Sequence, residues 1–411
     1  MNTPCSTCHT LYPQLNAFGR QFKLDAYALG AGTAKPIEAE GAGGRTALTL
    51  DGLPPLSVML QAAYTSTSAR LPDSQNNSAQ LPQEASLFVA GRIAPGLGSF
   101  VQLTYSQEDG AIALDNTELR YAKQGMLGGK PVTFGAVLNN NPTLEDLWSS
   151  TPAWGFPWAG ADVTPGPIAA ALVDGALAQD VMGVGGYASF GGKFYVHSAL
   201  YRSAHVGTTS PTAASENTID NAALYWRFAW QHPVGQQYLE LGTYGLHASL
   251  VPEGVAGASD DYDDVAVDLQ YERPVAARNL IAHGSYIDER QDLRASAAAG
   301  VAQRQHSGLD TLKLDVGLYG ERLAYVLGYA STQGQVDQLR YAPEELTGSA
   351  AGRPDSSAWL GELIYSPWQN VQLRLQYTAY TEFNGASRNY DGFGRDAADN
   401  NTLFLHAWLA W

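Results

Sequence analysis

Cysteine, positive charge and long apolar runs are all scarce in this chain of 411 residues. Lysine and arginine together number 24 against 40 aspartates and glutamates, which gives a formal net charge of -16. A chain this acidic lacks the basic surface that nucleic-acid binding requires, which excludes nucleic acid as a partner. No stretch reaches the roughly 18 apolar residues of a membrane-spanning helix, which excludes a helical membrane protein. A membrane β-barrel is not excluded, because its signature is alternation rather than bulk hydropathy.

The two cysteines of the chain lie in one short motif. Cys5 and Cys8 are followed directly by His9, so the stretch reads C-x-x-C-H. This spacing is the attachment signature of c-type haem, in which two thiols bond to the porphyrin and the adjacent imidazole binds its iron. The alternatives are chance spacing and a redox disulfide, but a thioredoxin-like pair needs a βαβ context that is missing here. The sequence therefore predicts one covalent haem c held by Cys5, Cys8 and His9.

A short helix is expected directly after the motif, because Pro13 suits a first helical turn. An apolar stripe at three- and four-residue spacing is formed by Leu11, Leu15, Phe18 and Phe22. This stripe either packs on another surface or covers the haem. About 40 residues are too few for a free-standing cytochrome, so we divide the chain into a c-type haem segment with its linker over 1–45 and a second domain over 46–411. Haem attachment takes place outside the cytoplasm, and no secretion signal precedes Cys5, so we expect the numbering to begin at a processed or altered terminus.

From Leu56 onward the dominant sequence period is two. In 312–318, for example, leucine and valine alternate with Lys313, Asp315 and Gly317. One apolar face and one charged face are typical of transmembrane β-strands, although soluble β-sandwiches also alternate. Tight turns alternate with longer segments, aromatic residues lie near many strand ends, and the chain closes on an alternating strand with a terminal aromatic residue. These three features favour an outer-membrane barrel with short periplasmic turns and long outer loops.

We therefore predict an all-β fold, a sixteen-stranded, porin-like transmembrane β-barrel in the bacterial outer membrane. Both ends of the barrel then fall on the side of the short turns, and the haem segment plugs the lumen or lies on the periplasmic side. The predicted strand cores are 56–66, 85–94, 98–108, 112–122, 131–138, 181–190, 193–203, 218–230, 236–250, 263–273, 278–288, 308–319, 322–333, 355–366, 370–382 and 402–411. The longest loop, 139–180, is rich in aromatic residues and proline, and two placements stay open for it: folded into the lumen, or external with tryptophans at the membrane edge.

The residues after the motif add a family resemblance. The stretch contains Pro13, Leu15-Asn16, Gly19-Arg20 and Phe22-Lys23, and a porin-like chain follows. This combination resembles the outer-membrane cytochrome–porin fusions of iron-oxidising bacteria. The resemblance implies an oxidoreductase that takes electrons from extracellular Fe(II) and passes them to a periplasmic c-type cytochrome or another electron carrier. It also implies that Cys5 and Cys8 hold the haem and His9 its iron, and porin-like homotrimers are expected by analogy only.

The second axial ligand of the haem iron should point into the lumen. Alternation turns Met59, His197 and His406 inward, whereas His247 and His283 face lipid or lie near strand ends. Met59 is favoured because methionine raises the haem potential relative to histidine, which suits an iron donor. Each of the three is also explained as a lumen side chain without a role in the site.

One-electron transfer needs no general base or nucleophile, so no catalytic residue is assigned. Acidic loop residues could concentrate cations near the outer mouth, or merely keep the loops soluble. They are Glu145, Asp146, Asp162, Asp260 and Asp261. Two other functions stay open: a diffusion porin whose haem segment is only a plug, and an outward conduit that reduces external metal.

Overall fold

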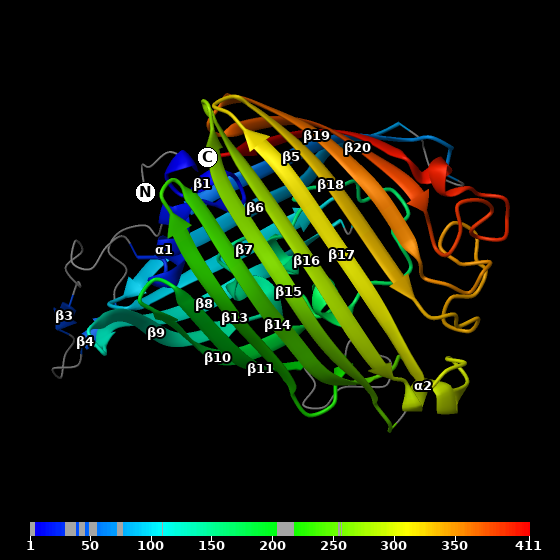
Figure 1. Cartoon of the computed structure of the whole chain (residues 1–411), viewed down its shortest axis with the longest axis horizontal. Helices are drawn as coiled ribbons and strands as arrows, with labels where there is room; N and C mark the ends of the chain where they lie inside the picture. Colours follow the sequence, from blue (N-terminus) through cyan, green and yellow to red (C-terminus); the bar gives the residue numbers. More distant parts are fainter. Residues whose placement is uncertain are drawn as a thin grey trace.

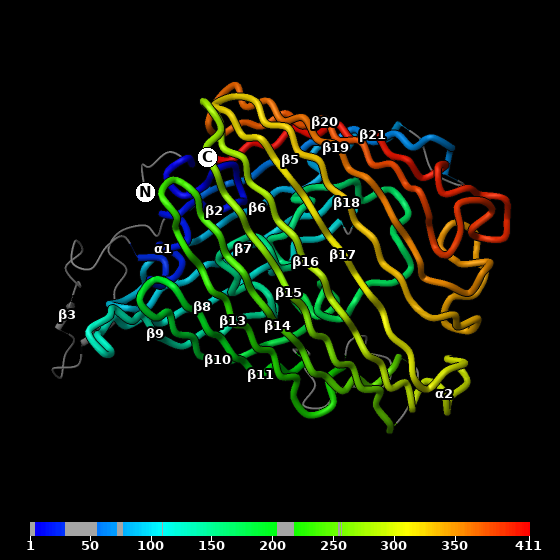
Figure 2. The backbone as a smooth tube through the Cα atoms, viewed as in Figure 1, coloured from blue at the N-terminus to red at the C-terminus, as the bar shows by residue number. Residues whose placement is uncertain are grey.

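A computed structural model describes residues 5–28, 38–40, 46–48, 56–71, 77–108, 110–203, 218–253, 255 and 257–411. Most of them form a closed antiparallel β-barrel (Figures 1 and 2). The first seven strands of the barrel are β5 (Leu56–Thr67), β6 (Ser78–Ala94), β7 (Leu97–Ser106), β8 (Ala111–Leu127), β9 (Lys130–Asn139), β10 (Val181–Phe190) and β11 (Phe194–Ser203). The remaining nine are β13 (Ala223–Val234), β14 (Gln237–Val251), β15 (Asp260–Val275), β16 (Arg278–Asp292), β17 (His306–Tyr319), β18 (Leu323–Gly334), β19 (Ser356–Trp368), β20 (Val371–Glu382) and β21 (Thr402–Ala410). The two-residue β12 (Thr218–Ile219) extends the sheet beside β13 by pairing with β14.

The barrel closes where β21 pairs with β5, so that Ala410 lies opposite Met59 and Thr402 opposite Thr67. Each predicted strand core overlaps one of the sixteen strands, which confirms the predicted count and order. The predicted core 218–230 begins too early, because it takes in β12 and the residues between β12 and β13. The start of β5 and the end of β21 lie at the end of the barrel that carries the short turns, and the long loops lie at the other end (Figure 1). Closure leaves no unpaired sheet edge, which a strand-based structure in lipid requires.

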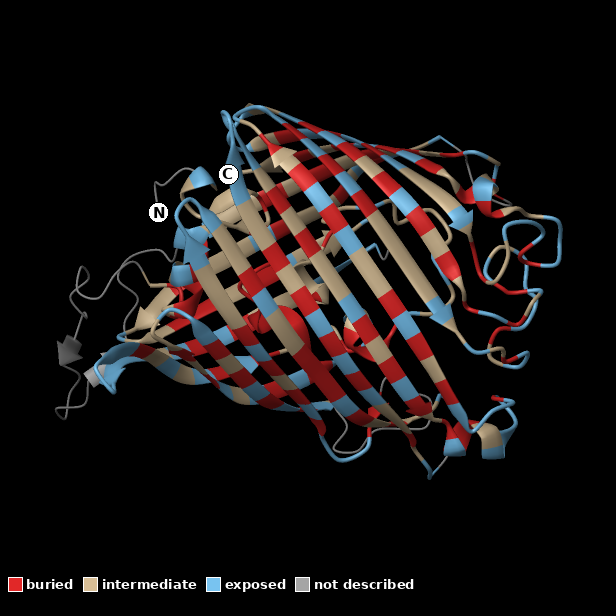
Figure 3. Cartoon of the chain, in the orientation of Figure 1, coloured by how far each residue is buried: buried red, intermediate tan, exposed pale blue. Residues whose placement is uncertain are grey.

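Burial alternates along the strands, as Figure 3 shows. Val265, Val267 and Leu314 are exposed on the outside, whereas Asp268 and Asp315 are buried on the inside. An apolar exterior around a polar interior is the arrangement of a lipid-embedded barrel. Among the described residues, no helix has the length and apolar character needed to cross a membrane.

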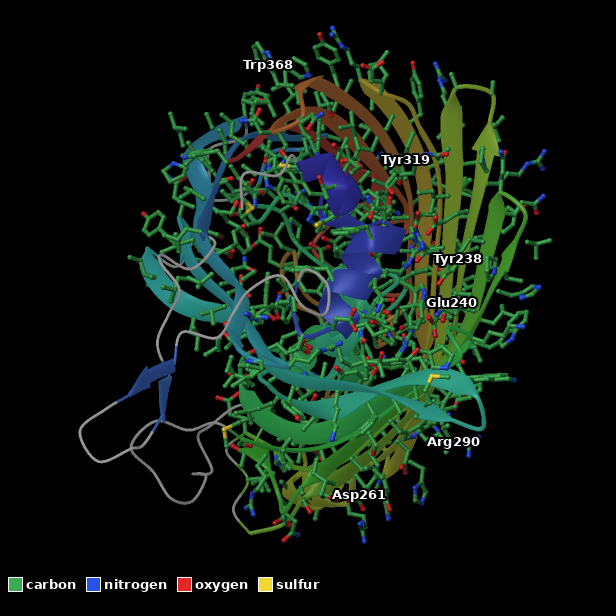
Figure 4. The ribbon with its side chains drawn as sticks, turned by 90° about the vertical axis from the view of Figure 1, so that its left-hand side faces the viewer. Tyr238, Glu240, Asp261, Arg290, Tyr319 and Trp368 are labelled. Atoms are coloured by element: carbon green, nitrogen blue, oxygen red, sulfur yellow. The ribbon has the colours of Figure 1, made fainter. Side chains whose placement is uncertain are left out.

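The described part of the segment predicted to carry haem, residues 5–28, lies across the lumen at the short-turn end (Figure 4, which looks into the barrel from that end). These residues are called the haem segment below. It comprises η1 (Cys5–Thr7), β1 (His9–Leu11), β2 (Gln14–Leu15) and α1 (Ala17–Leu24). The predicted helix exists but begins later than expected, because the side chain of Asn16 accepts the backbone N–H groups of Phe18 and Gly19 and caps α1. Pro13 instead lies in the turn between β1 and β2. The apolar stripe is only partly covered, since Phe18 is 47% exposed.

The long loop 139–180 folds into the lumen, which settles the choice left open by the sequence. It carries η2 (Pro142–Glu145), η3 (Pro152–Trp154) and η4 (Leu172–Ala176), and its Leu144 and Trp148 are buried. Its backbone is tied to the wall, where Glu289 accepts the N–H of Leu172. The loop therefore fills part of the space that sixteen strands enclose.

The remaining elements lie outside the barrel wall. At the long-loop end are α2 (Arg294–Ala299) and η5 (Ala397–Asn400), and between the haem segment and β5 the short strands β3 (Glu38–Glu40) and β4 (Thr46–Leu48) pair. The predicted domain boundary after residue 45 adjoins 41–45, which lie outside the described residues, so this boundary stays a prediction.

Candidate haem-binding site

A cavity of about 280 Å³ lies between the haem segment and the barrel wall. Cys5, Cys8 and His9 all line it, from one side. The strands contribute Met59 and Trp408. Further apolar lining comes from Tyr12, Leu15, Phe22, Tyr27, Phe88, Phe100 and Trp154. A concave, mainly apolar cavity with a few placed polar groups is the usual form of a cofactor site.

The two thiols of the motif are presented together. Cys5 is the first residue of η1, and the N–H of Cys8 donates to the carbonyl oxygen of Cys5 at 3.2 Å. Both side chains are half-buried free thiols, and burial raises the pKa of each. They therefore stay protonated at neutral pH, with both sulfurs at the wall of the cavity.

One ring nitrogen of His9 is held by the backbone. Its Nδ1 lies 3.0 Å from the carbonyl oxygen of Pro13, and the tautomer that donates there carries no proton on Nε2. Burial lowers the pKa of His9, which favours the neutral imidazole that binds iron. A backbone carbonyl fixing the second ring nitrogen is the common support for a metal-binding histidine.

Close packing holds the motif on α1. A Cβ atom on Gly19 would lie 2.1 Å from the carbonyl oxygen of Cys8, so only glycine fits at this crossing. The side-chain amide of Asn16 donates to the carbonyls of Ser6 and Thr7. The residues that follow the motif thus build its conformation from within the segment, and they suit a covalent haem.

Of the three predicted second ligands, the structure brings only Met59 to this cavity. Its side chain is 5% exposed, packs with Tyr12 and Trp408, and accepts the amide of Gln61 at 3.4 Å. A thioether at the cavity wall is a soft donor suited to haem iron.

His406 and His197 are buried on the lumen side but do not line the cavity. His406 Nε2 lies 2.7 Å from Gln61 Oε1, and its ring stacks on Phe404. His197 lies opposite Arg227 on β13, against Tyr225. The structure therefore gives neither histidine a position beside the motif.

The prediction that His283 faces lipid or lies near a strand end is wrong. It is buried in the lumen, where Nδ1 contacts Asp315 at 2.9 Å and Nε2 contacts the amide of Gln14 at 3.2 Å. Its neighbours Ile281 and Ile287 also point inward, because they pack against residues of the inward-folded loop. His283 lies on the same face of its strand as these two isoleucines. Alternation assigns an apolar face to the lipid, so it gave the wrong face for His283.

Two cationic side chains of α1 dock the haem segment. Arg20 pairs with Glu272 at 2.5 Å and lies over the ring of Tyr238 at 4.4 Å. Lys23 donates to the carbonyl oxygens of Leu144 and Asp146 at 2.5 and 2.8 Å. Burial lowers the pKa of Lys23 to about 8. One contact reaches the wall and the other the inward-folded loop, so the segment is held from two sides.

Sequence reasoning missed a buried cluster of charges around Arg227. Its guanidinium lies 2.8 Å from Asp268, 3.3 Å from Asp146 and 3.4 Å from Glu240. Glu145 and Asp146 were expected near the outer mouth, and that prediction is wrong because both are buried in the lumen. The inward position of Arg227 in an alternating strand was the signal available in the sequence. Its partners Glu240 and Asp268 come from β14 and β15, and Asp146 comes from the distant loop 139–180.

The other acidic loop residues are also engaged. Asp260 is buried and accepts the backbone N–H groups of Ala295 and Ser296, and Asp261 pairs with Arg294. Asp162 accepts the amide of Gln80. Across the described ranges, no three His, Cys, Asp or Glu side chains gather in a metal-binding arrangement.

Comparison with known proteins shows the porin fold. The structure is similar to OmpF of Salmonella typhi, with a TM-score of 0.50 and 11% identity over 87% of this chain and 97% of that one. It is also similar to the outer membrane channel DcaP of Acinetobacter baumannii, with a TM-score of 0.51 and 11% identity over 87% and 96%. No family model and no curated protein matches the sequence. The chain thus has the sixteen-stranded barrel of porins with a haem-type motif inside it.

Proposed function

We propose that the chain is an outer-membrane protein that transfers single electrons from extracellular Fe(II) to a periplasmic c-type cytochrome through one covalent haem c. The observation that carries this proposal is the convergence of Cys5, Cys8 and His9 on one apolar cavity inside a porin-fold barrel. The resemblance of the N-terminal stretch to cytochrome–porin fusions of iron oxidisers supports the choice of Fe(II).

The chemistry is an exchange of one electron. Bound haem c supplies a reversible one-electron couple. Fe(II) loses one electron and leaves as Fe(III), and the periplasmic carrier gains that electron. No bond to carbon is made or broken, so the chain needs no general acid, base or nucleophile.

The residues of the chain hold and tune the cofactor. Cys5 and Cys8 would hold the haem through thioether bonds, and His9 would bind its iron. Met59 would be the second protein ligand of the iron, because its thioether is the predicted ligand that lines the cavity. A thioether ligand and an apolar, water-poor surrounding both raise the haem potential, which suits acceptance of electrons from Fe(II).

A diffusion porin is the second candidate, and the shared fold with OmpF and DcaP favours it. The contents of the lumen favour the electron-transfer proposal instead. The haem segment and loop 139–180 both lie inside the barrel, and both are pinned by buried contacts of Lys23, Arg20 and Arg227. Space for a wide aqueous channel is correspondingly reduced.

A double Cys5→Ala, Cys8→Ala variant tests the proposal. The variant should insert and show the same heat-modifiable barrel as the wild type, but lose both covalent haem and Fe(II)-dependent reduction of an added cytochrome c. Retained Fe(II) oxidation in this variant would overturn the mechanism. Large, steady wild-type conductance in planar bilayers, together with no reduction of the haem by Fe(II), would favour the diffusion porin.

Two further measurements examine the ligand and the direction of electron flow. Met59→Leu keeps the apolar volume but removes the sulfur, so the near-infrared sulfur-to-iron band should disappear and the midpoint potential should fall. His406→Leu and His197→Leu are the matched controls and should leave that band intact. A strongly positive wild-type potential would speak against outward reduction of ferric minerals.

A further inference from the structure

Three cavities follow one another through the lumen beside the inward-folded loop. The outer cavity, about 240 Å³, is lined near the long-loop end by Thr332, Ser356 and Thr402. The middle cavity, about 140 Å³, is lined by Asp315, His283 and Ser150. The haem-site cavity described above is the third.

Neighbouring cavities share parts of their walls. Pro157, Ala330 and Leu360 line both the outer and the middle cavity. Ser149 lines both the middle cavity and the haem-site cavity. Thr332, Ser356 and Thr402 lie close to the long-loop ends of their strands, whereas Ala410 of the haem-site cavity lies at the short-turn end. The series therefore leads from the outer mouth towards the motif.

Polar oxygens line this route. In the outer cavity they come from Ser, Thr and Gln side chains of β18 to β21, together with a threonine of the loop. Ser149, Ser150 and Thr151 line the middle cavity together with Asp315. The carboxylate of Asp315 also contacts His283 Nδ1 at 2.9 Å. Hydroxyl, amide and carboxylate oxygens are suitable partners for a hydrated divalent cation.

The charge of the interior favours cations. Asp260, Asp337 and Asp391 are buried in the long-loop region, where they accept backbone N–H groups. Among the other described residues, nine buried carboxylates face five buried lysine or arginine side chains. Lys313 is the one lysine in the middle cavity wall, and Asp174 pairs with it at 2.5 Å. An excess of carboxylates in a narrow, low-dielectric passage raises the local cation concentration.

We propose that these cavities form a path by which a hydrated divalent cation enters from the long-loop end and pauses beside Asp315 in the middle cavity. This inference rests on the proposed function and deepens it: the substrate Fe(II) gives up its electron inside the lumen rather than at the outer surface. Fe(II) would give one electron to the bound haem, and the Fe(III) produced would return by the same route.

The test blocks the junction of the outer and middle cavities. Ala330→Trp places a bulky ring there, and Leu327→Trp, on the lipid-facing side of the same strand, is the matched control. In stopped-flow measurements on the holoprotein, Ala330→Trp should slow haem reduction by hydrated Fe(II) at least about tenfold, as a filled constriction does. The control should reduce at the wild-type rate. Equal rates in the two variants would overturn the proposal.

Labelling after folding keeps the test independent of misfolding. In the holoprotein, the thiol of the Ala330→Cys variant can be labelled with a bulky maleimide, because Cys5 and Cys8 are consumed as thioethers. Haem reduction by hydrated Fe(II) should fall after labelling, while the spectrum and midpoint potential stay unchanged. No loss of rate after complete labelling would again overturn the proposal.

The size of the donor gives a second arm. Fe(II) held on a chelating polymer too large to enter the barrel should reduce the wild-type haem far more slowly than hydrated Fe(II). Equal rates would place the reaction at the outer surface and contradict the path. Asp315→Asn should raise the half-saturating concentration of hydrated Fe(II) severalfold and leave the maximal rate nearly unchanged. An unaltered dependence of the rate on Fe(II) concentration would show that the cation does not pause beside Asp315.

Failure of the proposed function can be told apart from failure of the path. If hydrated Fe(II) never reduces a wild-type haem that dithionite reduces, the proposed function is wrong. The path is then judged by planar-bilayer current carried by magnesium ions. That current should be small but measurable in the wild type and in Leu327→Trp and lost in Ala330→Trp, and its absence from the wild type would refute the path as well.

Discussion

Removal of the Arg20 side-chain charge should loosen the haem segment in the lumen. Arg20 and Glu272 are mostly buried, with side chains 8% and 24% exposed, and their atoms lie 2.5 Å apart. A charge-assisted hydrogen bond of this kind contributes about 1.5–3 kcal/mol. Stacking on Tyr238 at 4.4 Å adds about 1 kcal/mol. Arg20→Met keeps the apolar stem, so the docking free energy should fall by about 3 kcal/mol, a factor of about 150 in the opening equilibrium.

Hydrogen exchange read by mass spectrometry on the holoprotein in nanodiscs measures this opening. The amides of α1 should exchange up to about 150-fold faster in Arg20→Met, while the barrel strands keep their protection. Gln21→Met on the exposed side of the same helix is the control and should leave exchange unchanged. In planar bilayers, Arg20→Met should also show more frequent brief openings. Equal α1 protection in the two variants would refute the idea that this pair docks the segment.

Three further perturbations test the site and its support. Gly19→Ala should lower the covalent haem content, because the new Cβ would collide with the carbonyl of Cys8. Haem content is measured as pyridine haemochrome per barrel, and a variant with as much haem as the wild type would contradict the packing described. Asn16→Ala should destabilise α1 by about 1 kcal/mol through loss of its cap, seen as faster exchange of the first helical amides, and equal exchange would argue against that cap. Arg227→Leu should cost about 3–5 kcal/mol in urea unfolding because it leaves buried carboxylates unpaired, and adding Asp268→Leu should recover part of it; no rescue would show that the pairing is not the cause.

The sequence by itself determined the barrel and the motif. Strand number and order follow from a period of two. Successive side chains of a strand point to opposite faces of the sheet, and this alternation does not depend on what packs against either face. The sequence alone therefore assigns Val265 to the outer face of the barrel and Asp268 to the inner face, without reference to the residues that contact them. Likewise, the spacing of Cys5, Cys8 and His9 is set by covalent chemistry within a few residues.

Only the tertiary structure decided what fills the lumen. Periodicity assigns Met59 and His406 to the same inner face, but which of them lines the cavity depends on the haem segment folding back across the barrel. His283 was misassigned because Ile281 and Ile287 face inward against a loop more than 100 residues away in sequence. Glu145 and Asp146 are buried because Arg227 of a distant strand neutralises them. Contacts of this kind join segments far apart in the chain, and no local pattern of residues records them.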